Sequence, residues 1–154
     1  MKKLLSGALA VLCCAALCCG CGEKKPSGLP KLTPVSVTIT QGGAPLADAI
    51  VSFYPATESN KQWACGGTTD SQGVLKVMTL GKYEGMVPDT YKVTVMKTLI
   101  ENPQLKEDDP PGQFFHLVDK KYMMESTTDL TITVTTDKDQ SYTLDVGEAV
   151  KIPQ

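Results

Sequence analysis

Val35-Ser36-Val37-Thr38-Ile39-Thr40 is the stretch that decides the fold, because apolar and polar residues alternate along it without interruption. Successive side chains point to opposite faces of a β-strand, so this alternation predicts a strand with one buried face and one solvated face. Shorter stretches of the same kind follow. The predicted strands lie at residues 35–40, 51–54, 66–69, 75–77, 91–96, 130–134 and 142–146.

Turn residues separate most of these stretches. Gly42-Gly43-Ala44-Pro45 follows the first strand, and Asp70-Ser71-Gln72-Gly73 predicts a hairpin turn before the strand at 75–77. No convincing amphipathic helix lies between the strands. We therefore predict an all-β fold, an antiparallel β-sandwich of about seven strands built as one domain.

Three motifs give the chain a resemblance to a known family. They are Gly43-x-Pro45-Leu46-x-x-Ala49-x-Val51-x-Phe53, Gly67-Thr68-Thr69-Asp70-x-x-Gly73-x-Leu75-x-Val77 and Asp89-Thr90-Tyr91-Lys92-Val93-Thr94-Val95. With these motifs the chain resembles the carboxypeptidase regulatory-like domain, a transthyretin-like (prealbumin-like) sandwich. The resemblance implies an Ig-like β-sandwich with Phe53 and Tyr91 between the sheets, and it implies no particular chemistry.

The first twenty residues have the pattern of a secretory signal peptide. Lys2 and Lys3 precede an apolar run from Leu4 to Leu17, and small residues lead to Cys21. The apolar run is short for a membrane-spanning helix, although an uncleaved anchor is the alternative when it is counted through Cys21. The sequence predicts a signal peptide at residues 1–20.

Leu17-Cys18-Cys19-Gly20-Cys21 resembles the lipobox of bacterial lipoproteins. The resemblance implies that Cys21 carries the lipid (palmitate and related acyl chains) and becomes the mature N-terminus, with Cys19 as a second-choice acceptor. Residues 21–34 are charged and rich in Pro and Gly, which predicts a flexible tether before the domain at 35–154. The residues after Cys21 lack the usual inner-membrane retention signal, which favours the outer membrane of the cell envelope.

The segment at 98–129 is long and contains no clear strand signal. It includes Pro103, Pro110-Pro111 and Phe114-Phe115-His116. Three interpretations stay open: a crossover between the two sheets, a binding loop, and a short helix near 115–122.

Composition argues against several functions. The chain contains no arginine and has a formal net charge of −2, which is unlike a nucleic-acid-binding protein. Beyond Cys21 only Cys65 remains, so no disulfide is expected within the domain. One histidine cannot supply a zinc ligand set, and Glu107-Asp108-Asp109 is typical of a solvated acidic run. We expect no metal and no cofactor.

Few residues of the chain are candidates for catalysis or ligand binding. His116 and Asp119 could act as a general-base pair with Ser126 in a hydrolase. No nucleophile motif accompanies them, so we expect no enzymatic activity. Trp63, Tyr54, Tyr83 and His116 are the candidate ligand-binding residues, because aromatic side chains at the rim of a sandwich stack on sugars or peptides. For Trp63 the favoured interpretation is instead a partly buried ring that covers one end of the sandwich.

These features predict a lipid-anchored cell-envelope module without catalytic activity, which binds a partner or holds an assembly together. The membrane, through the N-terminal lipid, and an envelope protein or glycan are the expected partners. An envelope carbohydrate-binding module is the alternative, and a hydrolase centred on His116 is the third hypothesis.

Overall fold

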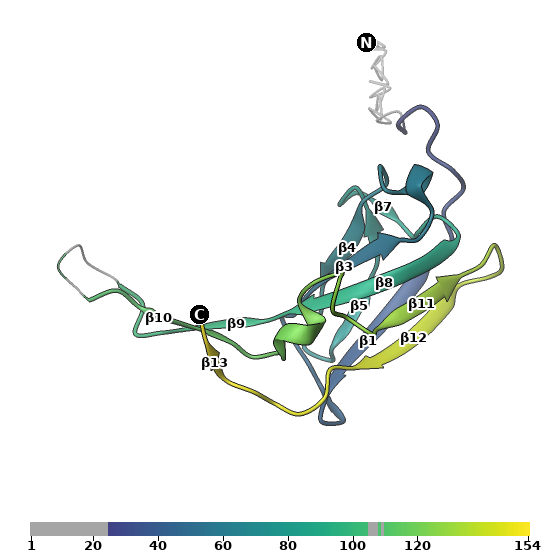
Figure 1. Cartoon of the computed structure of the whole chain (residues 1–154). Coiled ribbons are helices and arrows are strands. Elements are labelled where there is room, and N and C mark those ends of the chain that lie inside the picture. Colours follow the sequence, from purple (N-terminus) through teal and green to yellow (C-terminus); the bar gives the residue numbers. More distant parts are fainter. Residues whose placement is uncertain (1–24, 105–107, 109) are drawn as a thin grey trace, which may run out of the picture.

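The computed structural model describes residues 25–104, 108 and 110–154, in which strands dominate and the two helical segments are single 3₁₀ turns (Figure 1). The strands are β1 Val35–Gln41, β2 Ala44–Pro45, β3 Ile50–Pro55, β4 Cys65–Thr68, β5 Val74–Lys76, β6 Met78–Thr79, β7 Tyr83–Glu84, β8 Asp89–Met96, β9 Thr98–Glu101, β10 Gln113–His116, β11 Thr131–Val134, β12 Gln140–Asp145 and β13 Ile152–Pro153. The 3₁₀ turns are η1 Glu58–Asn60 and η2 Lys120–Tyr122. The all-β prediction is confirmed, and each predicted strand overlaps an observed one.

Two sheets enclose the core, an arrangement consistent with a β-sandwich. In the first sheet β1 is central, with β12 on one side and both β5 and β2 on the other. The second sheet has six strands in the order β11-β8-β3-β4-β6-β7. The core between them is formed by the inward residues of both sheets, among them Val37, Ile39, Leu75, Val51, Phe53, Tyr91, Val93, Val95, Ile132 and Val134.

One pairing corrects the expectation of a purely antiparallel sandwich. β1 and β12 are parallel, in register from Val35 opposite Gln140 to Thr40 opposite Asp145. The chain reaches β12 from β11, which belongs to the other sheet, so β12 crosses over and lies along the edge of β1 that β5 and β2 leave open. Alternation of side chains specifies a buried face but not the direction of the neighbouring strand.

A third sheet corrects the prediction that residues 98–129 contain no strand. β9 and β10 pair antiparallel, from Thr98 opposite His116 to Glu101 opposite Gln113. The C-terminal strand β13 adds to the far edge of β10. Figure 1 shows these three strands, which we call the arm, projecting from the sandwich as a continuation of β8.

The remainder of that segment returns to the sandwich. The short helix that was one of three interpretations near residues 115–122 is limited to η2, where the Asp119 carboxylate accepts a hydrogen bond from the Lys121 backbone N–H. Val118 and Tyr122 are buried in the core. The Thr128 hydroxyl donates a hydrogen bond to the Val93 carbonyl at 2.7 Å, which connects the segment to β8.

A turn forms at Asp70 to Gly73, but it is not the predicted hairpin turn, because β4 and β5 do not pair and β5 joins β1 in the other sheet. Gly73 has φ of +71°, and a Cβ at this position would lie 2.5 Å from the Ile39 carbonyl oxygen. The Asp70 carboxylate accepts hydrogen bonds from the backbone N–H groups of Gln72 and Val74. Glycine is therefore required both by the backbone angle and by the close approach of β1.

Ordered contacts begin before β1. Thr33 is buried and forms an isolated antiparallel bridge with Met86. Its hydroxyl donates to the Thr135 carbonyl at 2.8 Å. Within the described part of the chain, no helix has the length and apolarity needed to cross a membrane.

Candidate functional site

The six-stranded sheet is hollowed where β3 and β4 diverge. Their pairing ends at Phe53 opposite Cys65, whereas Tyr54 and Pro55 continue along β8 alone. The chain between the two strands loops outward through η1. It leaves a groove of about 330 Å³ bordered by Tyr54 and also by Lys61 from the loop and Glu125 from the segment after η2.

A second hollow of about 310 Å³ continues the first. Tyr54, Lys61 and Glu125 border both hollows, and Lys92 on β8 borders the second. Because they share these side chains, we treat the two hollows as one site, the Tyr54 groove. Residues of neighbouring strands also border it, among them Ser52 on β3 and Thr131 on β11.

Charged groups of both signs surround the groove. Lys61 Nζ lies 2.8 Å from a Glu58 carboxylate oxygen. The hydrogen bond and charge of Glu58, with a further contribution from Glu125, raise the pKa of Lys61. Lys92 Nζ donates to the Glu125 carbonyl oxygen at 3.2 Å. The groove thus combines two ammonium groups with the carboxylate of Glu125.

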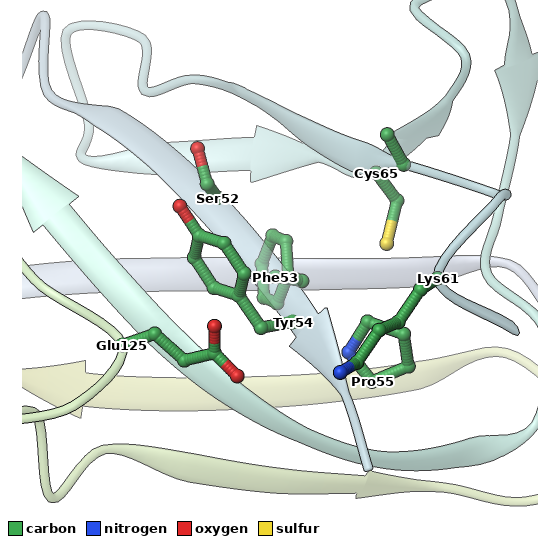
Figure 2. A pocket seen from close by; sticks show the side chains of 8 residues that line it. Ser52, Phe53, Tyr54, Pro55, Lys61, Cys65 and Glu125 are labelled. Atoms are coloured by element: carbon green, nitrogen blue, oxygen red, sulfur yellow. The ribbon is translucent and has the colours of Figure 1, made fainter. Parts of the chain in front are cut away.

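An aromatic ring lies among these charges. Tyr54 is 38% exposed, and Figure 2 shows its ring with Glu125 on one side of the groove and Lys61 on the other. The hydroxyl of Ser52 projects from the same strand face as Tyr54. A ring face bordered by hydroxyl, ammonium and carboxylate groups is the kind of surface that binds polar ligands with apolar faces.

Cys65 borders the groove but does not supply a nucleophile. Its side chain is 8% exposed, and burial raises the pKa of the thiol to about 12. The thiolate is the reactive form, so burial lowers the reactivity of this thiol at neutral pH. Nor do His, Cys, Asp and Glu side chains gather into a metal-binding group anywhere in the described ranges.

The structure separates the four ligand-binding candidates. Tyr54 lies in the groove, whereas Trp63, just after η1, is buried at 8% exposure and presents no open ring face. Tyr83 lies on β7 beside the residues preceding β1. His116 lies on the arm.

Of the three residues considered for a hydrolase, His116 and Asp119 have other partners, and Ser126 is exposed in the segment after η2. His116 Nδ1 lies 3.4 Å from Gln154 Nε2, a long contact within the arm. The Asp119 carboxylate accepts from the Lys121 backbone, as a cap of η2.

Sequence reasoning did not single out Ser52, Lys61, Lys92 and Glu125 as part of a site. A signal existed for two of them, because Ser52 and Lys92 alternate with buried residues and so point to the outer face together with Tyr54. Lys61 and Glu125 reach the groove from loops, and no sequence pattern indicates that they meet.

Neither a protein-family model nor a curated protein matches the sequence. Among solved structures, a 9R-lipoxygenase from Cyanothece PCC8801 is similar over 80% of this chain, with 13% identity and a TM-score of 0.39. The match covers 18% of the lipoxygenase chain, so this protein spans less than a fifth of its length. A similarity of this size says nothing about the activity of this chain.

Proposed function

We propose that this protein is a lipid-anchored binding module of the cell envelope without catalytic activity. The Tyr54 groove is the observation that supports the proposal, because it is an open hollow that joins an aromatic ring to charged and hydroxyl groups. Its thiol is buried, and the histidine of the chain lies on the arm rather than beside it. The arrangement favours binding over covalent chemistry.

The chemistry of the groove favours a glycan as the ligand. Sugars present an apolar face that stacks on aromatic rings and hydroxyl groups that bond to charged side chains. Tyr54 supplies the ring, while Lys61, Lys92 and Glu125 supply donors and acceptors around it. An envelope carbohydrate-binding module is therefore the second candidate, with Tyr54 in the role first considered for Trp63.

Replacement of Tyr54 by alanine is expected to weaken binding to glycans or cell-wall fragments about tenfold or more, because the stacking face is lost. The measurement is saturation binding of the purified chain to an array of such fragments. Phe114→Ala is the control, since it removes an exposed aromatic ring on the arm, outside the groove. Failure of every fragment to saturate, or equal affinity of Tyr54→Ala and wild type, would contradict glycan binding.

We also propose that the sandwich is of the Ig-like, carboxypeptidase regulatory-like (transthyretin-like) kind. Phe53 and Tyr91, which the motifs place between the sheets, pack edge to face with ring centroids 6.5 Å apart. Gly73 has the left-handed backbone that its motif position requires. These observations support the resemblance at the level of turns and core.

The proposed anchor depends on Cys21, which lies outside the described residues together with the leader at 1–20. The mass of the membrane-extracted protein is expected to correspond to a chain that starts at Cys21 and carries diacylglycerol, and Cys21→Ser is expected to lose this lipid. Intact-mass measurement of both proteins tests this expectation. Cosedimentation with outer-membrane fractions tests the proposed location.

The other outcomes of that measurement contradict the anchor in different ways. An uncleaved chain would indicate a membrane-spanning N-terminus. Cleavage without lipid would indicate a secreted module. Lipid on Cys19 would identify Cys19, instead of Cys21, as the lipid acceptor.

A further inference from the structure

The arm presents a strand edge to solvent. Within the ranges described, β9 pairs with β10 and with no second strand. Leu99 and Ile100 on β9 are 37% and 46% exposed, and Phe114 on β10 is 49% exposed. An exposed edge with apolar side chains is a template for adding another strand, which is why proteins usually cover or shorten such edges.

The backbone of Thr98 and Ile100 faces this edge. The Lys97 carbonyl accepts a hydrogen bond from the Leu117 N–H at 2.9 Å, and β9 continues along β10 in the same register. Hydrogen-bonding direction alternates along a strand, so residues 97, 99 and 101 bond towards β10. The N–H and C=O groups of Thr98 and Ile100 point away from β10, towards any strand that joins the edge.

The edge is complementary to an antiparallel copy of itself. Lys97 and Glu101 lie at equal spacing on the two sides of Leu99. When Leu99 of two copies is placed face to face, Lys97 of each copy lies opposite Glu101 of the other. The same register sets Thr98 opposite Ile100, which are the residues whose backbone groups face the edge.

We propose that two copies of this chain pair through β9 and join their arms into one continuous sheet. Opposite charges meet at both ends of the paired segment, and the hydrogen-bonding groups of the edge are satisfied in the same register. Leu99 of each copy contacts the other at the centre, next to Phe115, its neighbour on β10. The proposal is independent of the Tyr54 groove and of the lipid anchor.

Charge reversal tests the register directly. Lys97→Glu and Glu101→Lys each set like charges opposite one another twice, and each is expected to weaken self-association of the full-length chain about tenfold or more. An equimolar mixture of the two variants restores both ion pairs and is expected to form a heterodimer. Sedimentation equilibrium of each variant and of the mixture is the measurement.

Two controls separate pairing from folding. Lys138→Glu reverses a charge on the exposed connection between β11 and β12 and is expected to leave association unchanged. Glu101→Lys also loses its contact with Lys151, which lies 2.6 Å away within the same copy. Recovery of a dimer in the mixture shows that this variant is folded.

Crosslinking tests the central contact. Cysteine in place of Leu99 is expected to form a disulfide-linked dimer on mild oxidation, because side chains that face each other across antiparallel strands lie about 5 Å apart. Cysteine in place of Ile50, which is exposed on the sandwich, is the matched control. A wild-type chain that stays monomeric throughout, or Leu99→Cys crosslinking no faster than Ile50→Cys, would overturn the proposal.

Discussion

Replacing Tyr91 with alanine is expected to lower the free energy of unfolding by about 4 kcal/mol, since a large aromatic side chain is removed from a close-packed core. Tyr91 is 1% exposed and packs edge to face on Phe53. Its hydroxyl donates to the Val87 carbonyl at 2.6 Å. Truncation leaves a cavity between the sheets and a buried carbonyl without its donor. Urea unfolding followed by tryptophan fluorescence measures the change.

Two further variants separate the contribution of the Tyr91 ring from that of its hydroxyl and from the effect of removing any tyrosine. Tyr91→Phe keeps the ring and removes the hydrogen bond, so it is expected to cost about 1–2 kcal/mol. Tyr54→Ala removes a tyrosine that is 38% exposed, and it is expected to change stability much less than Tyr91→Ala. Equal destabilisation by Tyr91→Ala and Tyr54→Ala would show that Tyr91 does not support the core in this way.

The thiol of Cys65 is expected to react with iodoacetamide at pH 8 about a thousand times more slowly in the folded protein than in the unfolded chain. Burial raises the pKa of this thiol from 9.0 to about 12, which lowers the thiolate fraction by that factor. Labelling followed by mass spectrometry, with and without denaturant, gives both rates. An introduced cysteine at the exposed position 50 is the matched control. Rapid labelling of folded Cys65 would contradict the prediction.

The same raised pKa predicts how stability depends on pH. Below pH 9 the thiol is protonated in the folded and the unfolded chain, so it contributes no pH dependence. Between pH 9 and about 12 the unfolded chain loses this proton while the folded chain keeps it, so stability falls as pH rises. Burial also raises the pKa of Tyr91, so the contribution of Cys65 is measured as the difference between wild type and Cys65→Ala.

The strands of the sandwich could be predicted from the sequence because each has one buried and one solvated face. Val35, Val37 and Ile39 are buried in alternation with more exposed neighbours, and this contrast is what a period of two encodes. Strand order and the parallel pairing of β12 could not be predicted, since they depend on which edge of β1 remains open.

The arm could not be predicted for a related reason. Leu99 and Ile100 are both exposed, as is Phe114, so neither face of the arm has the contrast that marks a half-buried strand. Its last strand contains Pro153, which argues against a strand unless it lies at an edge, as it does here.

For the groove, the sequence indicated Tyr54 but not its surroundings. Tyr54 was a candidate because it is aromatic, and it lies on the outward face of β3, within the strand predicted at 51–54. Trp63 was a candidate for the same reason but is buried after η1. An aromatic side chain offers a large contact surface, but its residue type does not indicate whether a ligand or the rest of the protein covers that surface.

The parallel pairing of β1 with β12 sets the order in which the molecule is able to fold. Thr40 and Asp145 join across this pair through a side-chain hydrogen bond although they are 105 positions apart. Contacts between such distant residues require closure of a long loop, which slows folding. Until β12 pairs with β1, one edge of β1 remains open and prone to aggregation. The newly made chain is therefore most prone to aggregation before β12 has joined the sheet.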